Sequence, residues 1–180
     1  MKRLQLLILS VTTVLFSCER DDICAATTST TPRLIVEFYD IINTEELKSV
    51  TRLTVYGEDL LLEPPTSETV ETLVFNSNVN RIELPLLIGE ENVSTTTRYI
   101  FEKDTNRRLD ENNPQNSNVD ILEIRYTPEF IYVSRACGYK SQFIGLSSIV
   151  ESDDEVWINN IEIVEPTVNN ENTVHVRLFH

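Results

Sequence analysis

Strict alternation of apolar and polar residues is the clearest pattern in the chain. Residues 119–127 place Leu122, Ile124 and Tyr126 on one face, with Glu123 and Arg125 on the other. An alternation with a period of two predicts a half-buried β-strand. Weaker forms of the pattern recur from residue 33 onward and predict strands over 33–39, 50–56, 70–75, 79–84, 95–103, 130–133, 139–150, 156–164 and 173–179.

Turn-forming residues punctuate these strands. The Asn76-Ser77-Asn78 segment predicts a turn, and Pro128 is expected to interrupt the strand that ends near it, because proline lacks the N–H that a central strand needs. Gly145 predicts a β-bulge within residues 139–150. The Asn159-Asn160 pair fits either a bulge or a tight hairpin, and periodicity alone does not decide between them.

About eight to ten short strands with turn signals between them predict an all-β fold. The expected architecture is an antiparallel β-sandwich, Ig-like or similar, with a small β-barrel as the alternative, because the sequence shows no long helix and no βαβ rhythm. Trp157 shares its parity with Ile161 and Ile163 and is expected in the core. His175 falls at the outward parity of the last strand.

The N-terminus has the features of a secretory leader. Lys2 and Arg3 precede an apolar run over residues 4–16, which is shorter than the roughly 20 residues of a spanning helix. The run ends in Leu15-Phe16-Ser17-Cys18, which resembles the lipobox of bacterial lipoproteins, although Phe16 is bulkier than usual. The resemblance implies cleavage before Cys18 and lipidation of its sulfur. The alternative is an ordinary signal peptide in which Cys18 is incidental.

This leader divides the chain into three parts. Residues 1–17 are the expected lipoprotein signal peptide, residues 18–32 an acylated tether, and residues 33–180 a single β domain. Glu19-Arg20-Asp21-Asp22 is similar to the acidic cluster that directs Bacteroidota-type lipoproteins to the outer face of the outer membrane; a solvated spacer is the alternative. The expected location is the outer membrane, lipid-anchored, on its periplasmic or its cell-surface face.

Charge narrows the classes of partner. The 180 residues carry a net charge of −14, and removal of the leader leaves 13 basic against 29 acidic side chains, or −16. A nucleic-acid-binding protein needs a basic surface, so we expect no nucleic-acid partner. The hydrophobic content of 41% is enough for a packed core, which argues against disorder.

The three cysteines allow a pairing to be predicted. If Cys18 is lipidated, Cys24 and Cys137 remain as an even pair in an oxidising compartment, and we predict a disulfide between them. The competing interpretation is a reactive Cys137 thiol, for which the chain offers His175 or His180 as the base.

Candidate chemistry is otherwise sparse. The turn containing Glu151, Asp153, Asp154 and Glu155 has the oxygen ligands that calcium prefers but lacks the spacing of an EF-hand loop, so a solvated turn is the preferred interpretation. The two histidines lack partners at metal-ligand spacing, and no nucleophile elbow or phosphate-binding loop occurs. We therefore expect no catalytic residue, metal or cofactor.

Aromatic side chains could bind a ligand if they are exposed. Tyr132 and Tyr139 are the candidates for glycan contact, and the discriminating feature would be a concave patch that holds both rings.

Residues 31–40 and 126–139, read together with residues 18–24, are similar to a family of small Bacteroidota-type outer-membrane lipoproteins of unknown function. This resemblance implies a location and a disulfide, and no activity. The first functional hypothesis is a non-enzymatic envelope lipoprotein whose β domain contacts an envelope protein. A ligand- or glycan-binding lipoprotein is the alternative, and a hydrolase with paired carboxylates is the third.

Overall fold

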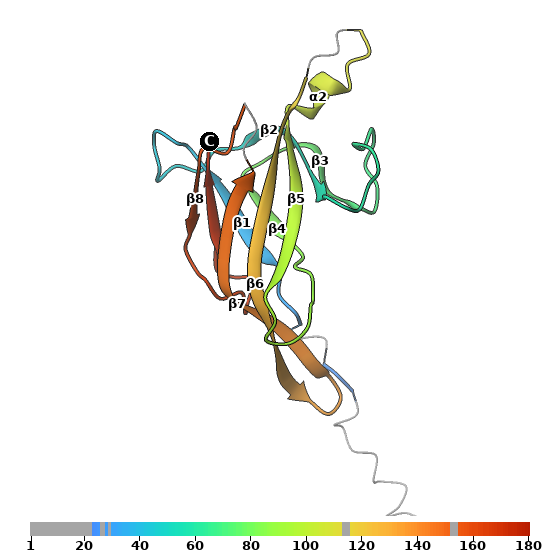
Figure 1. The fold of residues 1–180 in the computed structure, drawn as a ribbon, viewed down its shortest axis with the longest axis vertical. Helices are drawn as coiled ribbons and strands as arrows, with labels where there is room; N and C mark the ends of the chain where they lie inside the picture. Colours follow the sequence, from blue (N-terminus) through green and yellow to red (C-terminus); the bar gives the residue numbers. More distant parts are fainter. Residues whose placement is uncertain (1–22, 26–27, 29, 113–115, 152–154) are drawn as a thin grey trace, which may run out of the picture.

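Two β-sheets make up the body of the protein. The computed structural model describes residues 23–25, 28, 30–112, 116–151 and 155–180. The sheets are separate and face each other as a β-sandwich, as predicted, and the described residues do not close into a barrel (Figure 1). Among those same residues, no helix is long and apolar enough to cross a membrane.

The larger sheet has five antiparallel strands in the order β3-β2-β5-β6-β7. Its centre is β5, which pairs with β2 on one side and with β6 on the other. The strands run over β3 (Thr72–Val79), β2 (Val50–Gly57), β5 (Thr95–Lys103), β6 (Asn118–Ser134) and β7 (Gly138–Glu151).

The smaller sheet has four strands in the order β4-β1-β9-β8. They are β4 (Arg81–Leu84), β1 (Leu34–Tyr39), β9 (Val176–Phe179) and β8 (Asn160–Ile163). The pair β1–β9 is parallel, so the predicted antiparallel arrangement holds for every strand pair in the described sheets except this one. A single-turn helix, α2 (Thr105–Arg108), follows β5.

The core lies between the two sheets, and alternation decides which residues enter it. Leu122, Ile124 and Tyr126 of β6 are buried, as predicted. Across the interface, the ring of Phe38 on β1 packs edge-on against Phe101 of β5 at 6.3 Å between ring centroids. Trp157 is buried beside Phe38, which confirms its predicted core position.

The prediction that Pro128 interrupts the chain is wrong, because β6 continues through it to Ser134. Pro128 lies opposite Phe143, whose N–H and C=O both bond to Val168 at the outer edge of β7. Pro128 therefore occupies a non-hydrogen-bonded pair with β7, and its nitrogen faces away from that strand. On that other side β5 has already ended its pairing at Tyr126, so the missing N–H costs no ladder bond.

The predicted turn at Asn76-Ser77-Asn78 is also wrong, because all three residues lie within β3. The strand is irregular there: its register with β2 shifts, and Asn76 has a φ of 44°. Its N–H bonds to the Thr54 side chain on β2 at 3.0 Å instead of to a backbone carbonyl. As an edge strand, β3 accommodates this break because only one neighbour has to follow it.

The predicted bulge at Gly145 is confirmed. Between the pairs Arg125–Ser147 and Thr127–Ile144 the register slips by one residue, which leaves one extra residue on β7. Gly145 has a φ of 67°, a conformation that glycine adopts without strain. The Asn159-Asn160 pair is no hairpin: the N–H of Asn159 bonds to the Phe179 carbonyl, and Asn160 begins β8 opposite Phe179.

The outward placement of His175 is wrong. Its side chain is fully buried, and Nδ1 accepts a hydrogen bond of 3.0 Å from the N–H of Ile35. His175 comes just before β9, where the chain passes beside the start of β1. Side chains on both faces of the chain are therefore covered at this point. Burial lowers the pKa of His175, which favours the neutral imidazole.

Candidate functional site

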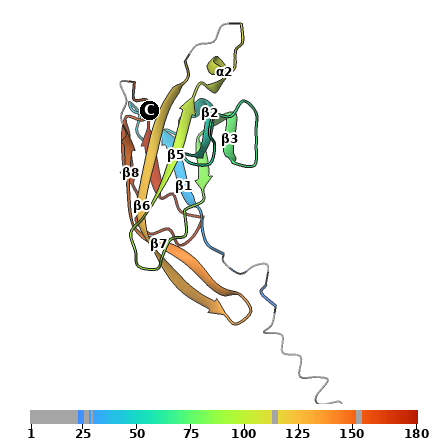
Figure 2. The ribbon, with the colours of Figure 1, turned by 45° about the vertical axis from the view of Figure 1, so that its right-hand side comes forward.

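The β6–β7 hairpin extends beyond the end of the four-stranded sheet, away from α2 (Figures 1 and 2). Up to Tyr126, β6 has neighbours on both sides, but from Thr127 onward it pairs with β7 alone. A three-residue loop, 135–137, joins the strands. Gly138 follows the loop with a φ of 70°, the left-handed position that three-residue hairpin loops require.

A disulfide ties the tip of this hairpin to the start of the described chain. Cys24 and Cys137 are bonded, with their Cα atoms 4.8 Å apart. These are the two cysteines that remained as a pair once Cys18 was set aside. Because both sulfurs are in the bond, the interpretation of Cys137 as a reactive thiol does not hold. Cys18 itself lies outside the described residues.

Thr31, seven residues after Cys24, lies at the free edge of the hairpin. The N–H of Ser141 on β7 donates to the Thr31 hydroxyl at 3.0 Å. The N–H of Arg33 donates to a Glu171 carboxylate oxygen at 2.9 Å, and the Arg33 guanidinium binds the same carboxylate. The disulfide and the Thr31–Ser141 bond hold the start of the β domain against the hairpin, while Glu171, between β8 and β9, ties Arg33 to the body.

Tyr132 and Tyr139 face each other across the hairpin near its tip. Both rings are exposed, with centroids 5.4 Å apart and planes at 68°. Two rings in an edge-to-face pair do not form one flat surface on which a sugar ring could stack. The structure thus brings the two candidate residues together, but not in the arrangement expected of a glycan site.

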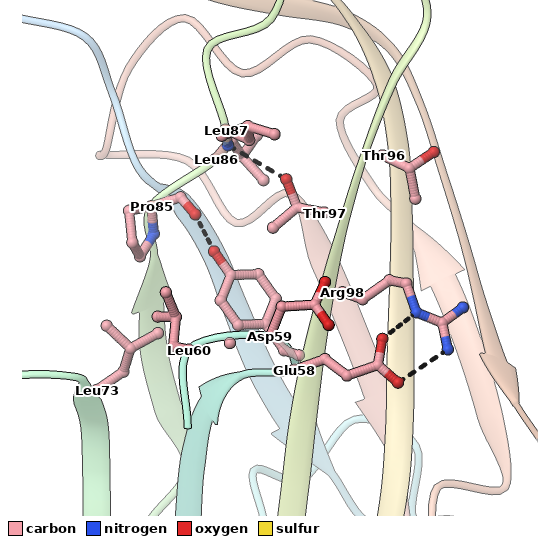
Figure 3. A pocket seen from close by; sticks show the side chains of 12 residues that line it. Glu58, Asp59, Leu60, Leu73, Pro85, Leu86, Leu87, Thr96, Thr97 and Arg98 are labelled. Atoms are coloured by element: carbon pink, nitrogen blue, oxygen red, sulfur yellow. Dashed lines mark hydrogen bonds and ion pairs between the residues drawn. The ribbon is translucent and has the colours of Figure 1, made fainter. Parts of the chain in front are cut away.

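A separate cavity of about 380 Å³ opens between the end of β2, β5 and the segment after β4 (Figure 3). Its apolar walls come from residues far apart in the sequence: Leu60, Leu73, Pro85, Leu86, Leu87 and Tyr99. The Tyr99 hydroxyl donates to the Pro85 carbonyl, so the single ring in the cavity wall is fixed and buried. Burial raises the pKa of Tyr99, which keeps the phenol protonated.

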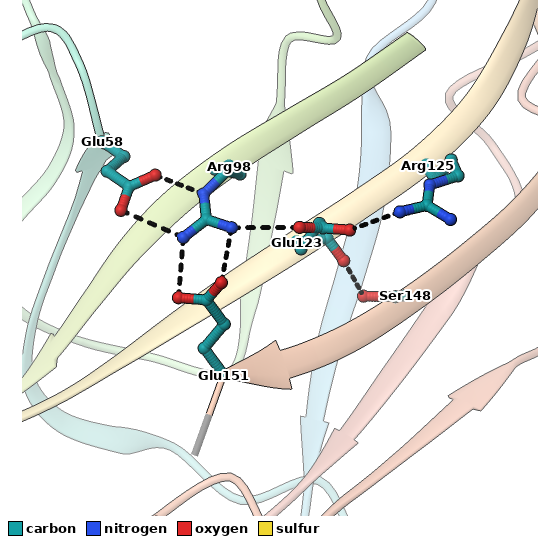
Figure 4. Close-up of polar contacts among 6 residues, drawn as sticks. All are labelled: Glu58, Arg98, Glu123, Arg125, Ser148 and Glu151. Atoms are coloured by element: carbon teal, nitrogen blue, oxygen red, sulfur yellow. Dashed lines mark hydrogen bonds and ion pairs between the residues drawn. The ribbon is translucent and has the colours of Figure 1, made fainter. Parts of the chain in front are cut away.

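Arg98, at one end of this cavity, is enclosed by carboxylates (Figure 4). Its guanidinium binds Glu151 through two hydrogen bonds of 2.6 and 2.7 Å, and it also contacts Glu58 and Glu123. The hydrogen bonds that Arg98 donates to Glu151 and Glu58 raise the pKa of Arg98 further, and Arg98 in turn lowers the pKa of Glu151. All five N–H groups of a guanidinium point in fixed directions, and three carboxylates leave Arg98 little capacity for a ligand.

Glu102 forms a second carboxylate–arginine pair on β5. It lies on the face of β5 opposite to Tyr99 and Phe101, and Arg108 of α2 covers it there. Arg108 binds both carboxylate oxygens at 2.6 and 2.8 Å. Burial by itself raises the pKa of Glu102, but hydrogen bonds from Arg108, Ser117 and Thr105 outweigh it and leave the pKa below its usual value. Glu102 is therefore an ionised structural group.

The acidic turn and the two histidines were the residues considered as metal ligands. Within the described ranges, no group of three or more His, Cys, Asp and Glu side chains could hold a metal ion. In the acidic turn, Glu151 is bound to Arg98, while Asp153 and Asp154 lie outside the described residues. His180 is buried beside Trp157 and Phe38, and burial lowers its pKa.

Sequence reasoning missed the cavity and the Arg98 cluster. Both depend on which strands become neighbours, and alternation carries no such information. A partial signal was present, because Arg98 and Glu123 occupy the same outward face of two strands that were predicted correctly.

Comparisons with known proteins add a family. The comparison with curated proteins found no match, and neither did the comparison with solved structures. A family model does match, over residues 52–180, which is most of the chain and covers β3 to β9 together with nearly all of β2. The model describes a family of unknown function, so it carries no activity. The chain belongs to this family, DUF6452.

Proposed function

We propose that the protein is a lipoprotein of the Bacteroidota type, anchored in the outer membrane by acyl chains on Cys18. The leader over residues 1–17 and the lipobox-like Leu15-Phe16-Ser17-Cys18 support this proposal. Two or more acyl chains anchor stably, at about 0.8 kcal/mol per buried methylene, whereas one chain alone gives marginal attachment.

The observation that carries the proposal is the disulfide between Cys24 and Cys137. Disulfides persist in oxidising compartments such as the bacterial periplasm and the cell surface, and they are rare in the cytosol. Cys24 is six residues from Cys18, a distance of at most about 20 Å in a fully extended chain. The bond would therefore hold the β domain close to the membrane instead of on a long linker.

For the role of the domain, we propose a non-enzymatic interaction module in the envelope. Groups that could do acid–base chemistry are engaged in structural contacts: Glu102 with Arg108, Arg98 with three glutamates, and Asp40 with Lys48 at 2.8 Å. Hydrogen bonds from Lys48 and from the N–H groups of Asn43 and Ile42 hold the pKa of Asp40 well below its usual range. A general acid or base needs a pKa near the working pH, so these groups suit a scaffold better.

The anchor is tested by mass spectrometry of the protein purified from membranes. The expected N-terminal peptide begins at Cys18 and carries the mass of a diacylglyceryl group. Cys18→Ser should abolish the lipid and release the protein from the membrane fraction, while Cys24→Ser should leave the lipid in place. An unmodified Cys18 in membrane-associated wild-type protein would refute the anchor.

The interaction role is tested by cross-linking in intact cells followed by purification of the anchored protein. A specific envelope protein should be recovered with wild type and lost with Cys18→Ser at equal expression. Recovery of only the protein itself, together with no effect of deleting the gene on the envelope, would contradict the role.

The cavity beside Tyr99 favours a second candidate function, the binding of an apolar ligand. Four leucines, Pro85 and Tyr99 form its apolar walls and its one cation is already bound by carboxylates, so an uncharged apolar compound fits best. Nile red fluorescence would increase on binding, and Leu87→Gln, an exposed wall position, should reduce the increase severalfold. Leu62→Gln, an exposed leucine outside the wall, is the matched control.

A further inference from the structure

We propose that the tip of the β6–β7 hairpin, residues 130–141, is a membrane-contact site that rests in the lipid headgroups beside the anchor. This inference depends on the proposed lipidation of Cys18. It adds a second point of attachment, made by side chains instead of acyl chains, and so fixes which end of the sandwich faces the membrane.

The disulfide limits how far the hairpin tip can lie from the lipid anchor. Cys137 lies in the loop of the hairpin tip, and its Cα is 4.8 Å from that of Cys24. The six-residue span back to Cys18 extends to about 20 Å at most. The headgroup layer on each side of a bilayer is roughly 5–8 Å thick, so the tip cannot move far from it once Cys18 is anchored. Of the described body, the tip is the part bonded covalently nearest to the anchor.

The tip exposes aromatic and aliphatic side chains that suit a membrane interface. Phe130, Ile131, Tyr132 and Tyr139 are 37%, 38%, 59% and 70% exposed. Tyrosine is suited to a membrane interface, because its ring enters the apolar boundary while its hydroxyl stays hydrated. The edge-to-face arrangement that makes Tyr132 and Tyr139 a poor sugar platform places no restriction on burial in lipid.

The tip also carries basic side chains. Residues 130–141 contain Arg135 and Lys140 and no acidic residue, in a chain whose net charge is −14; the adjoining acids are Glu129, which precedes them, and Glu91, which accepts a hydrogen bond from the N–H of Phe130. Anionic lipid attracts each basic residue near its surface, and long basic side chains place their charge among headgroups while their stems lie along apolar surface. The rest of a strongly acidic body is repelled from the same surface. The charge of Arg135, in the loop at the end of the hairpin, thus favours an orientation with this tip toward lipid.

Exposed apolar residues elsewhere lack this combination. Leu62 and Val70 are almost fully exposed, but they lie in the loop between β2 and β3, which the disulfide does not tie to Cys24. Single exposed apolar residues in loops are normal and need no partner. In the hairpin, by contrast, the four residues are held on one two-stranded ribbon by its ladder and by the disulfide.

The test is quenching of tryptophan fluorescence by brominated lipid. Lipidated protein with Tyr139→Trp is purified from membranes and reconstituted in vesicles of brominated phosphatidylcholine with phosphatidylglycerol. Its added fluorescence, relative to the parent protein that holds only the buried Trp157, should fall by about half or more, as expected for a ring at the interface. Leu62→Trp, in the loop between β2 and β3 that lies away from the hairpin tip in both views, should keep its signal (Figures 1 and 2).

Two further variants separate lipid contact from mere proximity. In the Tyr139→Trp background, Arg135→Glu with Lys140→Glu should weaken the quenching, most strongly in vesicles that contain phosphatidylglycerol. Phe130→Ser with Ile131→Ser should weaken it in vesicles with and without that lipid. All four positions are at the surface of the hairpin, and circular dichroism of each variant verifies that the fold is kept.

The failure of the anchor and the failure of the contact give different results. If intact mass shows lipid on Cys18 but the tryptophan at position 139 is not quenched, the contact is refuted and the anchor stands. Equal quenching of tryptophans at positions 139 and 62 would also refute it, because the body would then lie flat on the bilayer. Absence of lipid on Cys18 would overturn both proposals.

Discussion

The two halves of β6 differ in their surroundings although they belong to one continuous strand. From Asn118 to Tyr126 the strand pairs with β5 and β7, and its inward side chains are buried under the other sheet. From Thr127 to Ser134 it pairs with β7 alone, and Phe130 and Tyr132, at the parity of Leu122 and Ile124, are exposed. The same alternation thus continues past the point where the protein supplies a cover.

This difference shows what alternation does and does not specify. It fixes which side chains share a face, but burial requires a second layer over that face. In the first half the layer is the four-stranded sheet. In the second half we propose that it is the membrane. If so, apolar side chains in the first half should determine stability, and those in the second half should determine position on the membrane.

Truncation of one apolar residue in each half tests this contrast most strongly. Leu122→Ala removes a fully buried side chain and should lower the free energy of unfolding by about 3–4 kcal/mol. Tyr132→Ala removes an exposed ring and should change it by roughly 0.5 kcal/mol or less. Urea denaturation of the two variants measures both values. Equal losses would mean that the hairpin is part of the cooperative core.

Loss of the disulfide should have the next largest effect on the free energy of unfolding. The bond is at the hairpin tip, next to the half of β6 that pairs with β7 alone. Cys137→Ser opens a link between residues 113 apart and should lower the free energy of unfolding by about 2–3 kcal/mol. It should also increase proteolysis between Cys24 and Pro32, because that segment loses its attachment at the tip. Cys24→Ser breaks the same bond and is the control; limited proteolysis with mass spectrometry locates the cuts. Unchanged cleavage would show that other contacts hold the segment.

Lowering the pH should destabilise the body of the protein without loosening the hairpin tip. Burial lowers the pKa of His175 below its usual 6.5, so the unfolded chain binds a proton more readily than the folded one. The stability contributed by the neutral imidazole is therefore full above about pH 6.5 and falls as the pH drops below that value. His175→Asn, which keeps an acceptor for the Ile35 N–H, should flatten this dependence in denaturation measured from about pH 7.5 to 5. Residues 130–141 contain no His, Asp or Glu, so tether proteolysis should not rise before the body unfolds.

Two glycines give the smallest and most closely matched comparison. Gly138 at the tip and Gly145 at the bulge have φ values of 70° and 67°, and an added Cβ would meet no atom within 4 Å at either. Alanine at each should cost about 1 kcal/mol from backbone strain alone. Thermal unfolding should therefore give similar shifts for both variants. A much larger loss at Gly145 would show that the bulge also sets how the two halves meet.

The strands themselves could be predicted to a large extent, because Leu122, Ile124 and Tyr126 follow the period of two closely. The errors at Asn76 and Pro128 have a common cause: each residue lies at a position where one side of its strand has no ladder to complete. Residues that normally break strands are tolerated there. His175 was placed wrongly because its neighbour β1 comes from the other end of the chain.

Of the candidate site, the Cys24–Cys137 pair followed from counting, and counting does not require knowledge of the fold. The position of that pair at the tip of a long hairpin did not follow, because it depends on how far β6 and β7 extend past the body. The carboxylates around Arg98 come from β6, from β7 and from the residue directly after β2, and only the sheet order brings them together.

The parallel pair β1–β9 sets an order of events in folding. Val36 pairs with Val176 and Phe38 with Leu178, so β1 cannot complete its pairing until β9 has been synthesised. Contacts this distant in sequence form slowly, because a long loop must close before they stabilise the chain. The four-stranded sheet is thus incomplete while the chain is being synthesised. For a protein exported unfolded, as the proposed anchor requires, this delay keeps the chain able to pass through an export channel and leaves folding to the far side of the membrane.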